Sequence, residues 1–300
     1  SICLKDLDWE PGAVAPLAAS TLPIEVLGTN GTIRSVTLVV TNGDTADNLW
    51  FRVDNLSYDG KMSVRANGGA WVTFTDTNVV YPDREFSQYG MGGISSVLRF
   101  HFTIDGEWPI YNGTNTFDFR FNDADGKTIG YRIIDFTPRA GTTRLLHSSQ
   151  LPEEDPLTWT VPGGDINAGS NLWFTATIKE RGTNLVATCN GCHVRGGWDL
   201  KYFNYSPKSI VERSIFHGLT PVESTNIAAF ILSRPVSYVA AARPWNPVYQ
   251  PGPGMDAKPV HEWAAGAGWD EVMENGTNSL TYIFPSGILT NWLDLNVPVN

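Results

Sequence analysis

The sequence contains little sulfur and no long apolar run. Its 300 residues include 3 cysteines, 4 methionines and 5 histidines. So few cysteines exclude a scaffold held together by many disulfides, and they leave too few ligands for a zinc site built from two cysteine pairs. No stretch approaches the roughly 18 consecutive apolar residues of a membrane span, so we expect no transmembrane helix.

Positive charge is also scarce. The 31 aspartates and glutamates outnumber the 21 lysines and arginines, which gives a net charge of −10. An acidic surface repels phosphate backbones, so nucleic acid is not an expected partner. Hydrophobic residues make up 42% of the chain and charged residues 17%. That composition is typical of a folded protein with a sizeable core rather than of a disordered one.

The first half of the chain predicts an antiparallel β-sandwich. Apolar and polar residues alternate, and turn residues such as Asn42-Gly43 and Asn67-Gly68 interrupt the alternation. This pattern, with a turn about every 8–12 residues, is typical of sandwich folds. We therefore expect an all-β domain over residues 1–140, with strands over residues 32–40, 49–53, 62–65, 70–74, 96–104 and 115–121.

A change of composition marks a predicted domain boundary. Residues 141–164 are rich in proline, glycine and acidic residues, which predicts a linker. Beyond it, Ser206-Pro207 and Thr220-Pro221 each place a capping residue before a proline, as at the start of a helix. The fold class expected is therefore multidomain, with the β-sandwich followed by a mainly α domain over residues 165–300.

The most specific motif is Cys189-Asn190-Gly191-Cys192-His193. The spacing C-x-x-C-H is that of a c-type haem attachment site. Two intervening residues let one helical turn present both thiols to the porphyrin edge, where they add across the vinyl groups. The adjacent histidine then becomes an axial ligand of the iron. We predict one covalent haem c, bound by Cys189, Cys192 and His193, with His193 as the ligand of the iron.

Two residues are candidates for the second axial ligand of the iron. Met255 ends the Pro/Gly-rich segment 249–255, whose backbone can fold flat across a haem, and His217 precedes Gly218. A thioether ligand raises the reduction potential, whereas a second histidine lowers it. Each residue also has a purely structural interpretation, because Met255 can fill an apolar gap and His217 can end a helix that Gly218 caps.

These motifs resemble those of known cytochromes. Residues 249–255 resemble the Y-x-P-G-x-x-M ligand loop of mitochondrial-type cytochromes c, and the second half of the chain resembles a monohaem cytochrome c domain. Residues 198–206, with the His217 and Trp245 segments, resemble a cytochrome type found in multidomain secreted bacterial proteins. The resemblance implies a mainly α haem domain, although the long segment after residue 232 departs from the mitochondrial pattern.

These expectations converge on electron transfer outside the cytoplasm, where haem c is generally attached. We expect a periplasmic or extracellular protein whose export signal has been removed, and which passes single electrons between redox partner proteins. An iron with an open sixth position would instead suit a peroxidase-like enzyme or a gas-binding protein. A third alternative is a structural subunit of an extracellular cytochrome filament or larger redox complex. We favour the electron carrier over an enzyme.

The β-sandwich is expected to act as a module that docks the haem domain onto a partner or assembles copies of the chain. It resembles immunoglobulin-like and carbohydrate-binding sandwiches, which implies a redox protein, a second copy of the chain or a polysaccharide as its partner. Trp50, Trp71 and Trp108 are candidate platforms for stacking sugars. The alternation along the strands favours instead the burial of these three side chains between the two sheets.

Overall fold

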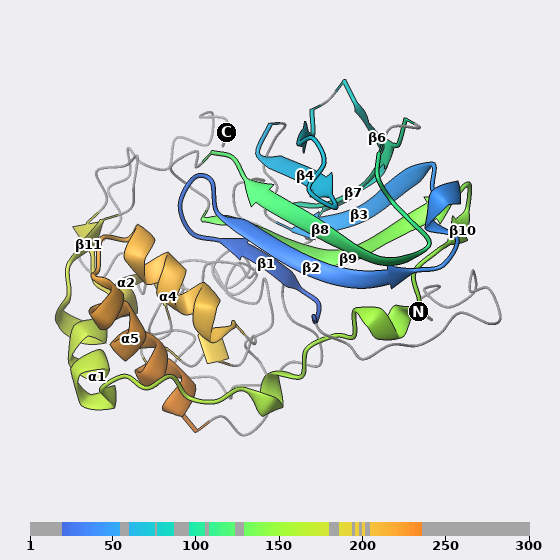
Figure 1. Ribbon diagram of the computed structural model, residues 1–300. Coiled ribbons are helices and arrows are strands. Elements are labelled where there is room, and N and C mark those ends of the chain that lie inside the picture. The colour runs from blue at the N-terminus through green and yellow to red at the C-terminus, as the bar shows by residue number, and fades with distance from the viewer. Residues whose placement is uncertain are drawn as a thin grey trace, which may run out of the picture. The chain divides into compact units, whose positions relative to one another are not determined.

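The computed structural model of the chain is shown in Figure 1. It describes residues 20–54, 60–75, 77–86, 96–105, 108–123, 129–179, 186–193, 196–197, 200–201 and 205–235. The chain divides into two compact units. The first unit comprises Ser1–Phe86 and Ser96–Asp155, and the second unit comprises Ser87–Ser95 and Pro156–Asn300.

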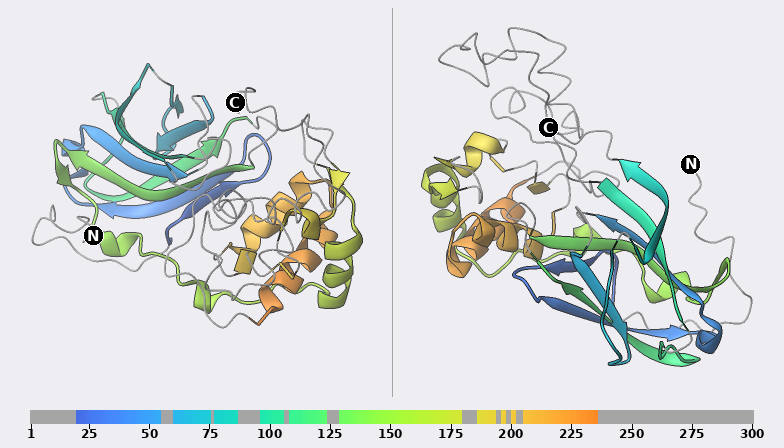
Figure 2. Two further views of the ribbon diagram at one scale, coloured as in Figure 1. Left: turned by 180° about the vertical axis from the view of Figure 1, so that it is seen from behind. Right: turned by 90° about the horizontal axis from the view of Figure 1, so that it is seen from above.

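Two antiparallel sheets make up the described part of the first unit (Figures 1 and 2). Their strands are β1 (Ile24–Leu27), β2 (Ile33–Val40), β3 (Asn48–Asp54), β4 (Met62–Ala66), β5 (Val72–Thr73), β6 (Val79–Phe86), β7 (Ser96–Thr103), β8 (Gly113–Phe121), β9 (Gly130–Ala140) and β10 (Thr143–Arg144). The larger sheet has the order β1-β9-β3-β7-β6, with β10 also pairing to β9. The smaller sheet has the order β2-β8-β4-β5. Short 3-10 turns lie at Gly43–Thr45 and Ser148–Gln150.

Alternation along each strand decides which face is buried. In β2, Val36 and Leu38 are at most 2% exposed, whereas Ser35 and Thr37, which alternate with them, are exposed. Successive side chains of a strand point to opposite faces, so the apolar face of each sheet can pack against the other sheet. One continuous core cluster accordingly contains buried side chains from both sheets.

Phenylalanine rings at the centre of this core join the two sheets. Phe51 of the larger sheet is 1% exposed. Its ring centroid lies 5.0 Å from that of Phe136, 5.2 Å from that of Phe100 and 6.3 Å from that of Phe119 in the smaller sheet. Edge-to-face and offset contacts at such distances are favourable beyond the burial of apolar area. Aromatic packing across the core therefore holds the two sheets together.

The described part of the second unit combines short helices with one small hairpin. Its elements are η4 (Pro156–Thr158), α1 (Ile166–Thr175), β11 (Ile178–Lys179), β12 (Val186–Ala187), α2 (Cys189–Cys192), α4 (Pro207–Phe216) and α5 (Pro221–Ser233). Strands β11 and β12 pair with each other in antiparallel orientation. None of the helices in the described part of the chain is both long and apolar enough to cross a membrane.

Helices α1 and α5 form the centre of the second unit. Trp173 of α1 is 2% exposed, and its ring centroid lies 6.3 Å from that of Phe230 in α5. The two helix backbones approach closely at Gly169, where an added Cβ would lie 2.0 Å from the carbonyl oxygen of Asn226. Only a residue without a side chain allows this approach. The contact therefore depends on a glycine in the middle of a helix.

A capping box begins α5. The Thr220 hydroxyl oxygen accepts a hydrogen bond from the Glu223 backbone N–H at 3.3 Å, and the Glu223 carboxylate accepts one from the Thr220 N–H at 2.8 Å. The bond from the Thr220 backbone lowers the pKa of Glu223. A carboxyl whose pKa is lowered by folding stabilises the protein at neutral pH, and this contribution is lost as the pH falls through the lowered pKa.

Replacing Thr220 by alanine is expected to lower the free energy of unfolding by about 1 kcal/mol, because α5 loses a side-chain acceptor for its first-turn N–H groups. Denaturant unfolding followed by far-UV circular dichroism measures this loss. The matched control is Val222→Ala, because Val222 lies in the same turn and is 71% exposed. An equal effect of both substitutions would contradict the capping role.

The predicted fold class was wrong for the second half of the chain. The described residues are mostly β, and those between residues 156 and 235 form three helices of ten residues or more, α1, α4 and α5. They do not form a distinct mainly α cytochrome domain. Each of these helices is short because a residue or element that ends a helix follows closely. Helix α1 is followed by the β11–β12 hairpin, and α4 is followed by Gly218, which has a φ of 98°. Residues 236–300 of the predicted domain lie outside the described residues.

Much of the segment predicted as a linker packs on the sandwich. Strand β10 pairs with β9, and Leu145, Leu146 and Leu151 are between 2% and 6% exposed within the core of the first unit. The division between the two units falls after Asp155, inside the predicted range 141–164. Proline and glycine in this segment therefore mark turns of the sandwich as well as a passage between units.

Candidate haem-attachment site

One helical turn carries the C-x-x-C-H motif. It begins directly after the β11–β12 hairpin, with Thr188 at the N-cap and α2 over Cys189–Cys192. The His193 backbone N–H donates a hydrogen bond to the Cys189 carbonyl oxygen at 3.0 Å, which closes the turn. Backbone positions 189 and 192 are thus one helical turn apart, and positions with this spacing share one face of a helix. This is the local geometry that the motif predicted.

The Cys189 side chain is buried and forms no disulfide with a described residue. It is 7% exposed and belongs to the core cluster that includes Trp173, Ile227 and Phe230. A thiol in apolar surroundings is shielded from solvent. The α1 and α5 side chains therefore give this cysteine an apolar environment, as a porphyrin edge requires.

His193 is half-buried beside an indole ring. Its ring centroid lies 5.7 Å from that of Trp173, with an angle of 42° between the two planes. Trp173 is itself fixed in the core against Phe230. A bulky, immobile neighbour restricts the rotation of the imidazole. Helix α1 therefore positions the predicted iron ligand, and this contact could not be read from the spacing of the motif.

His217, the first candidate for the sixth ligand in chain order, ends α4. Its backbone N–H donates to the Arg213 carbonyl oxygen at 3.1 Å, and its ring packs against Phe216 with centroids 5.9 Å apart. Gly218 follows with a φ of 98°. The backbone here is the helix end that the structural interpretation of His217 predicted.

Met255, the second candidate, lies outside the described residues. Within the part of the chain that the structure describes, no cluster of three or more histidine, cysteine, aspartate and glutamate side chains could hold a metal ion. The choice between Met255 and His217 therefore stays a prediction.

The residues present fit a haem attached at the motif. The turn has the backbone spacing that two thioether bonds need, the Cys189 thiol is buried, and the His193 side chain lies against a fixed aromatic ring. The side-chain oxygen of Asn190 is buried and has no hydrogen-bond partner among the described residues. An unsatisfied buried oxygen is costly unless a group absent from the protein coordinates satisfies or covers it.

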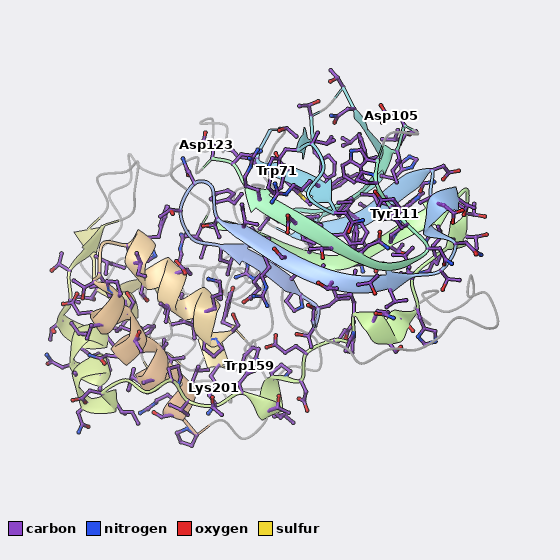
Figure 3. The ribbon with its side chains drawn as sticks, in the orientation of Figure 1. Trp71, Asp105, Tyr111, Asp123, Trp159 and Lys201 are labelled. Atoms are coloured by element: carbon purple, nitrogen blue, oxygen red, sulfur yellow. The ribbon has the colours of Figure 1, made fainter. Side chains whose placement is uncertain are left out.

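Lys201, eight residues after His193, lies beside the C-terminal end of α5 (Figure 3). Its Nζ donates hydrogen bonds to the carbonyl oxygens of Leu232 at 2.6 Å and Arg234 at 2.5 Å. Partial burial lowers the pKa of Lys201. A cation at a helix C-terminus satisfies carbonyl groups that have no intrahelical partner. Sequence reasoning missed this residue, because a single lysine carries no signal for a helix end that is distant in sequence.

Two of the candidate sugar platforms lie on the outer faces of the sandwich. Trp50 contacts His101, with ring centroids 4.6 Å apart, and the Arg139 guanidinium lies 4.9 Å from its ring. Burial lowers the pKa of His101. Leu49 and Phe51, the neighbours of Trp50 in β3, are buried in the core. Trp50 therefore faces away from the core. The predicted burial of Trp50 between the sheets was wrong.

Trp71 lies at the edge of the smaller sheet (Figure 3). The guanidinium carbons of Arg65 and Arg120 lie 4.5 Å and 4.3 Å from its ring centroid. These arginines alternate with core residues such as Phe119, so Trp71 also lies on an outer face and its predicted burial was wrong. Trp108 differs, because it packs half-buried against the core with its ring 5.6 Å from that of Phe102.

Comparison with known proteins gives no family for this chain. No protein-family model, no curated protein and no solved structure matches it. The function therefore has to be argued from the geometry above.

Proposed function

We propose that this chain is a c-type haem protein that carries single electrons outside the cytoplasm. The observation that carries the proposal is the closed helical turn Cys189–Cys192 followed by His193 against Trp173. The C-x-x-C-H spacing is specific, because two thiols and an imidazole are needed at fixed places around one porphyrin. When bound, the haem supplies a reversible one-electron iron couple.

The chain's own residues then have separate tasks. Cys189 and Cys192 hold the cofactor covalently, and His193 supplies one nitrogen ligand whose orientation Trp173 restricts. The apolar cluster around Cys189 excludes water. A low-dielectric environment tunes the reduction potential of an iron centre and limits reorganisation when its charge changes. A second ligand, Met255 or His217, would complete the coordination required of an electron carrier.

The β-sandwich is proposed as a docking or assembly module for this redox unit. Its outer faces carry polar and charged pairs such as Ser35–Asp118 and Arg65–Asp118, and the net charge of −10 favours a basic redox partner. A peroxidase-like or gas-binding function would require an open position on the iron. A structural role in a filament or larger redox complex would require contacts between copies of the chain.

Absorption spectra of the purified protein test the proposal. Ferric and dithionite-reduced spectra, recorded with and without carbon monoxide, are expected to be low-spin and unchanged by carbon monoxide, because two protein ligands occupy the axial positions. A sulfur-to-iron band in the ferric spectrum would assign Met255, and its absence would assign His217. A high-spin spectrum that shifts with carbon monoxide would replace electron transfer by an enzyme or gas-binding function.

A further inference from the structure

Strand β2 lies at one end of the smaller sheet, and its backbone is open along Ile33–Thr37, which we call the β2 edge. In an antiparallel pair, the peptide groups of alternate residues point toward the neighbouring strand and away from it. The Thr32 carbonyl oxygen accepts from the Phe121 N–H, whereas the Val39 N–H donates away from β8 to the Gln150 side chain at 3.3 Å. The outward-pointing groups of the β2 edge therefore belong to Ile33, Ser35 and Thr37. In the described part of the chain, no backbone hydrogen bond reaches these groups on the open side.

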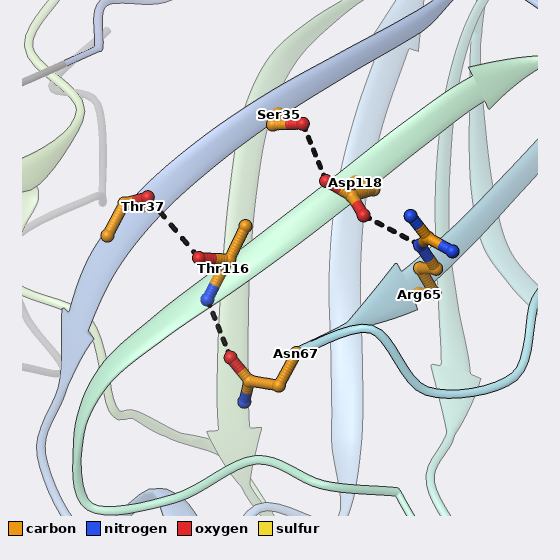
Figure 4. Close-up of polar contacts among 6 residues, drawn as sticks. All are labelled: Ser35, Thr37, Arg65, Asn67, Thr116 and Asp118. Atoms are coloured by element: carbon orange, nitrogen blue, oxygen red, sulfur yellow. Dashed lines mark hydrogen bonds and ion pairs between the residues drawn. The ribbon is translucent and has the colours of Figure 1, made fainter.

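The side chains of the β2 edge leave these peptide groups uncovered (Figure 4). The Ser35 hydroxyl donates to the Asp118 carboxylate at 2.6 Å, and the Thr37 hydroxyl oxygen lies 3.4 Å from that of Thr116, so both are turned toward β8. Proteins normally protect an edge strand with lysine, proline, a bulge or a covering segment. Strand β2 contains no proline, pairs with β8 without a register shift, and has Arg34 as its one charged residue.

The open stretch is limited at both ends. Before it, the Thr32 N–H donates to the Thr29 carbonyl oxygen at 3.1 Å and closes a turn. After it, Val40 forms an antiparallel bridge with Leu146, in the segment that packs along the end of β2. An added strand can therefore pair with the β2 edge over the five residues Ile33–Thr37 and no further.

We infer that the β2 edge pairs with the β2 edge of a second copy of the chain, antiparallel and around a two-fold axis at Ser35. Ser35 then lies opposite Ser35 of the second copy, and Ile33 lies opposite Thr37. Each of these pairs can exchange two hydrogen bonds, so every outward peptide group of the edge is used. A slip of two residues in one direction would place Arg34 opposite Arg34, which is unfavourable. A slip in the other direction would need the Val39 N–H, which is already bound.

The side chains of the edge suit a second copy better than a foreign peptide. Ile33 is 48% exposed and would lie beside Thr37 of the second copy, and pairs of β-branched residues are favourable across strands. Recognition of a foreign peptide needs side-chain pockets for specificity, whereas Ser35 and Thr37 are small and bound to β8. Strand β2 has no acidic residue, so the negative charges of the two chains do not meet on it.

A two-fold contact of this kind closes on itself, so it produces a dimer rather than a filament. The inference rests on the docking or assembly role proposed for the sandwich, and it names the partner as a second copy of the chain.

Sedimentation velocity of the full chain at about 5 µM to about 300 µM tests the inference, because a small interface gives a weak dimer. We expect a dissociation constant on the order of 50 µM. Both copies are acidic and β2 contributes no ion pair, so the dimer should become stronger as salt rises from about 50 mM to about 500 mM. A chain that stays monomeric at about 300 µM overturns the inference and leaves the edge to an extended segment of another protein. A dimer that weakens with added salt also overturns it, because ion pairs would then form the interface.

Variants locate the interface. Ile33→Lys and Thr37→Pro are each expected to weaken the dimer by about tenfold, because every substitution acts twice in a two-fold dimer. Lysine places a charge beside the second strand, and proline removes an outward N–H. Neither removes a hydrogen bond of the β2–β8 pairing, because residues 33 and 37 turn their peptide groups outward. The matched control is Val80→Lys, since Val80 is 51% exposed on β6 of the larger sheet. Equal weakening by Val80→Lys, or none by the first two substitutions, overturns the assignment to the β2 edge.

Introduced cysteines test the register in a chain that also carries Cys3→Ala. Opposite residues of a hydrogen-bonded antiparallel pair have Cα atoms about 5.5 Å apart, which is within the span of a disulfide. Ser35→Cys should therefore give a disulfide-linked dimer on a non-reducing gel. Thr37→Cys should not, because the two copies of residue 37 would lie about 13 Å apart along the strands. A linked dimer of Thr37→Cys without one of Ser35→Cys overturns the two-fold axis at Ser35.

The haem spectrum is recorded on the same samples, so that two failures can be told apart. A protein with covalent haem that stays monomeric overturns the pairing of the β2 edge alone. A protein without haem that dimerises through the β2 edge overturns the electron-carrier proposal alone.

Discussion

A chain in which alanine replaces both Cys189 and Cys192 is expected to contain no covalently bound haem. Both thioether bonds depend on these thiols, because the third cysteine, Cys3, lies far from the motif in sequence and has no adjacent histidine. Haem staining of a denaturing gel measures the loss, since only covalent haem stays with the unfolded chain. The expected result is complete loss of the stained band, which is the largest effect of any substitution considered for this protein.

Single substitutions refine that experiment. Cys189→Ala should retain haem through Cys192 alone, and the reduced α band should shift to longer wavelength because one vinyl group stays conjugated. Cys3→Ala is the control and should leave the spectrum and staining unchanged. Far-UV circular dichroism separates loss of attachment from loss of fold, because Cys189 is also a core residue at 7% exposure. A stained band in the double variant would contradict attachment at this motif.

The sequence predicted individual strands and helices well where alternation or a capping residue alone defines them. Alternation defined β2 and β3, and the capping residues Ser206 and Thr220 begin α4 and α5 as expected. Strand β9 was not singled out. Its consecutive Ile133 and Ile134 break the alternation, because the pairing register with β3 shifts beside them.

The orientation of Trp50 shows a second limit of predicting burial from the sequence. Leu49, Phe51 and Val53 are all at most 1% exposed, so their spacing already places Trp50 on the opposite face of β3. That signal was present in the sequence, but the hydrophobic character of tryptophan favoured burial. The half-buried indole is stabilised by Arg139, whose guanidinium lies 4.9 Å from the ring. The arginine comes from another strand, so its contact follows from register rather than from local sequence.

In the candidate haem site, too, the local geometry could be predicted from the sequence and the long-range contacts could not. The turn at Cys189–Cys192 follows from the motif, because its spacing is itself a helical spacing. The contacts of Trp173 with His193 and of Lys201 with the end of α5 join segments that are distant in sequence. Such contacts depend on how helices pack, and a single sequence does not specify that packing.

Replacing Gly169 by alanine is expected to lower the free energy of unfolding of the second unit by about 2 kcal/mol. The added Cβ would lie 2.0 Å from the Asn226 carbonyl oxygen and 3.0 Å from the Phe230 Cβ, so α1 and α5 must move apart. Because the clash is with backbone atoms, we take the upper end of the usual overpacking cost of about 1–3 kcal/mol, of which the better helix propensity of alanine returns about 1 kcal/mol. Denaturant unfolding followed by far-UV circular dichroism gives the difference.

Gly163→Ala is the matched control for this substitution. A Cβ at Gly163 meets no atom within 4 Å. The free energy of unfolding of the Gly163→Ala variant should therefore stay close to that of the unaltered protein. The effect of Gly169→Ala should also reach the haem motif, because Trp173 lies one turn further along α1 and packs on the His193 ring. A shift of the His193 ring resonances in NMR spectra would show this coupling. Unfolding free energies equal to the control, with unchanged His193 resonances, would contradict the proposal that this helix contact positions the iron ligand.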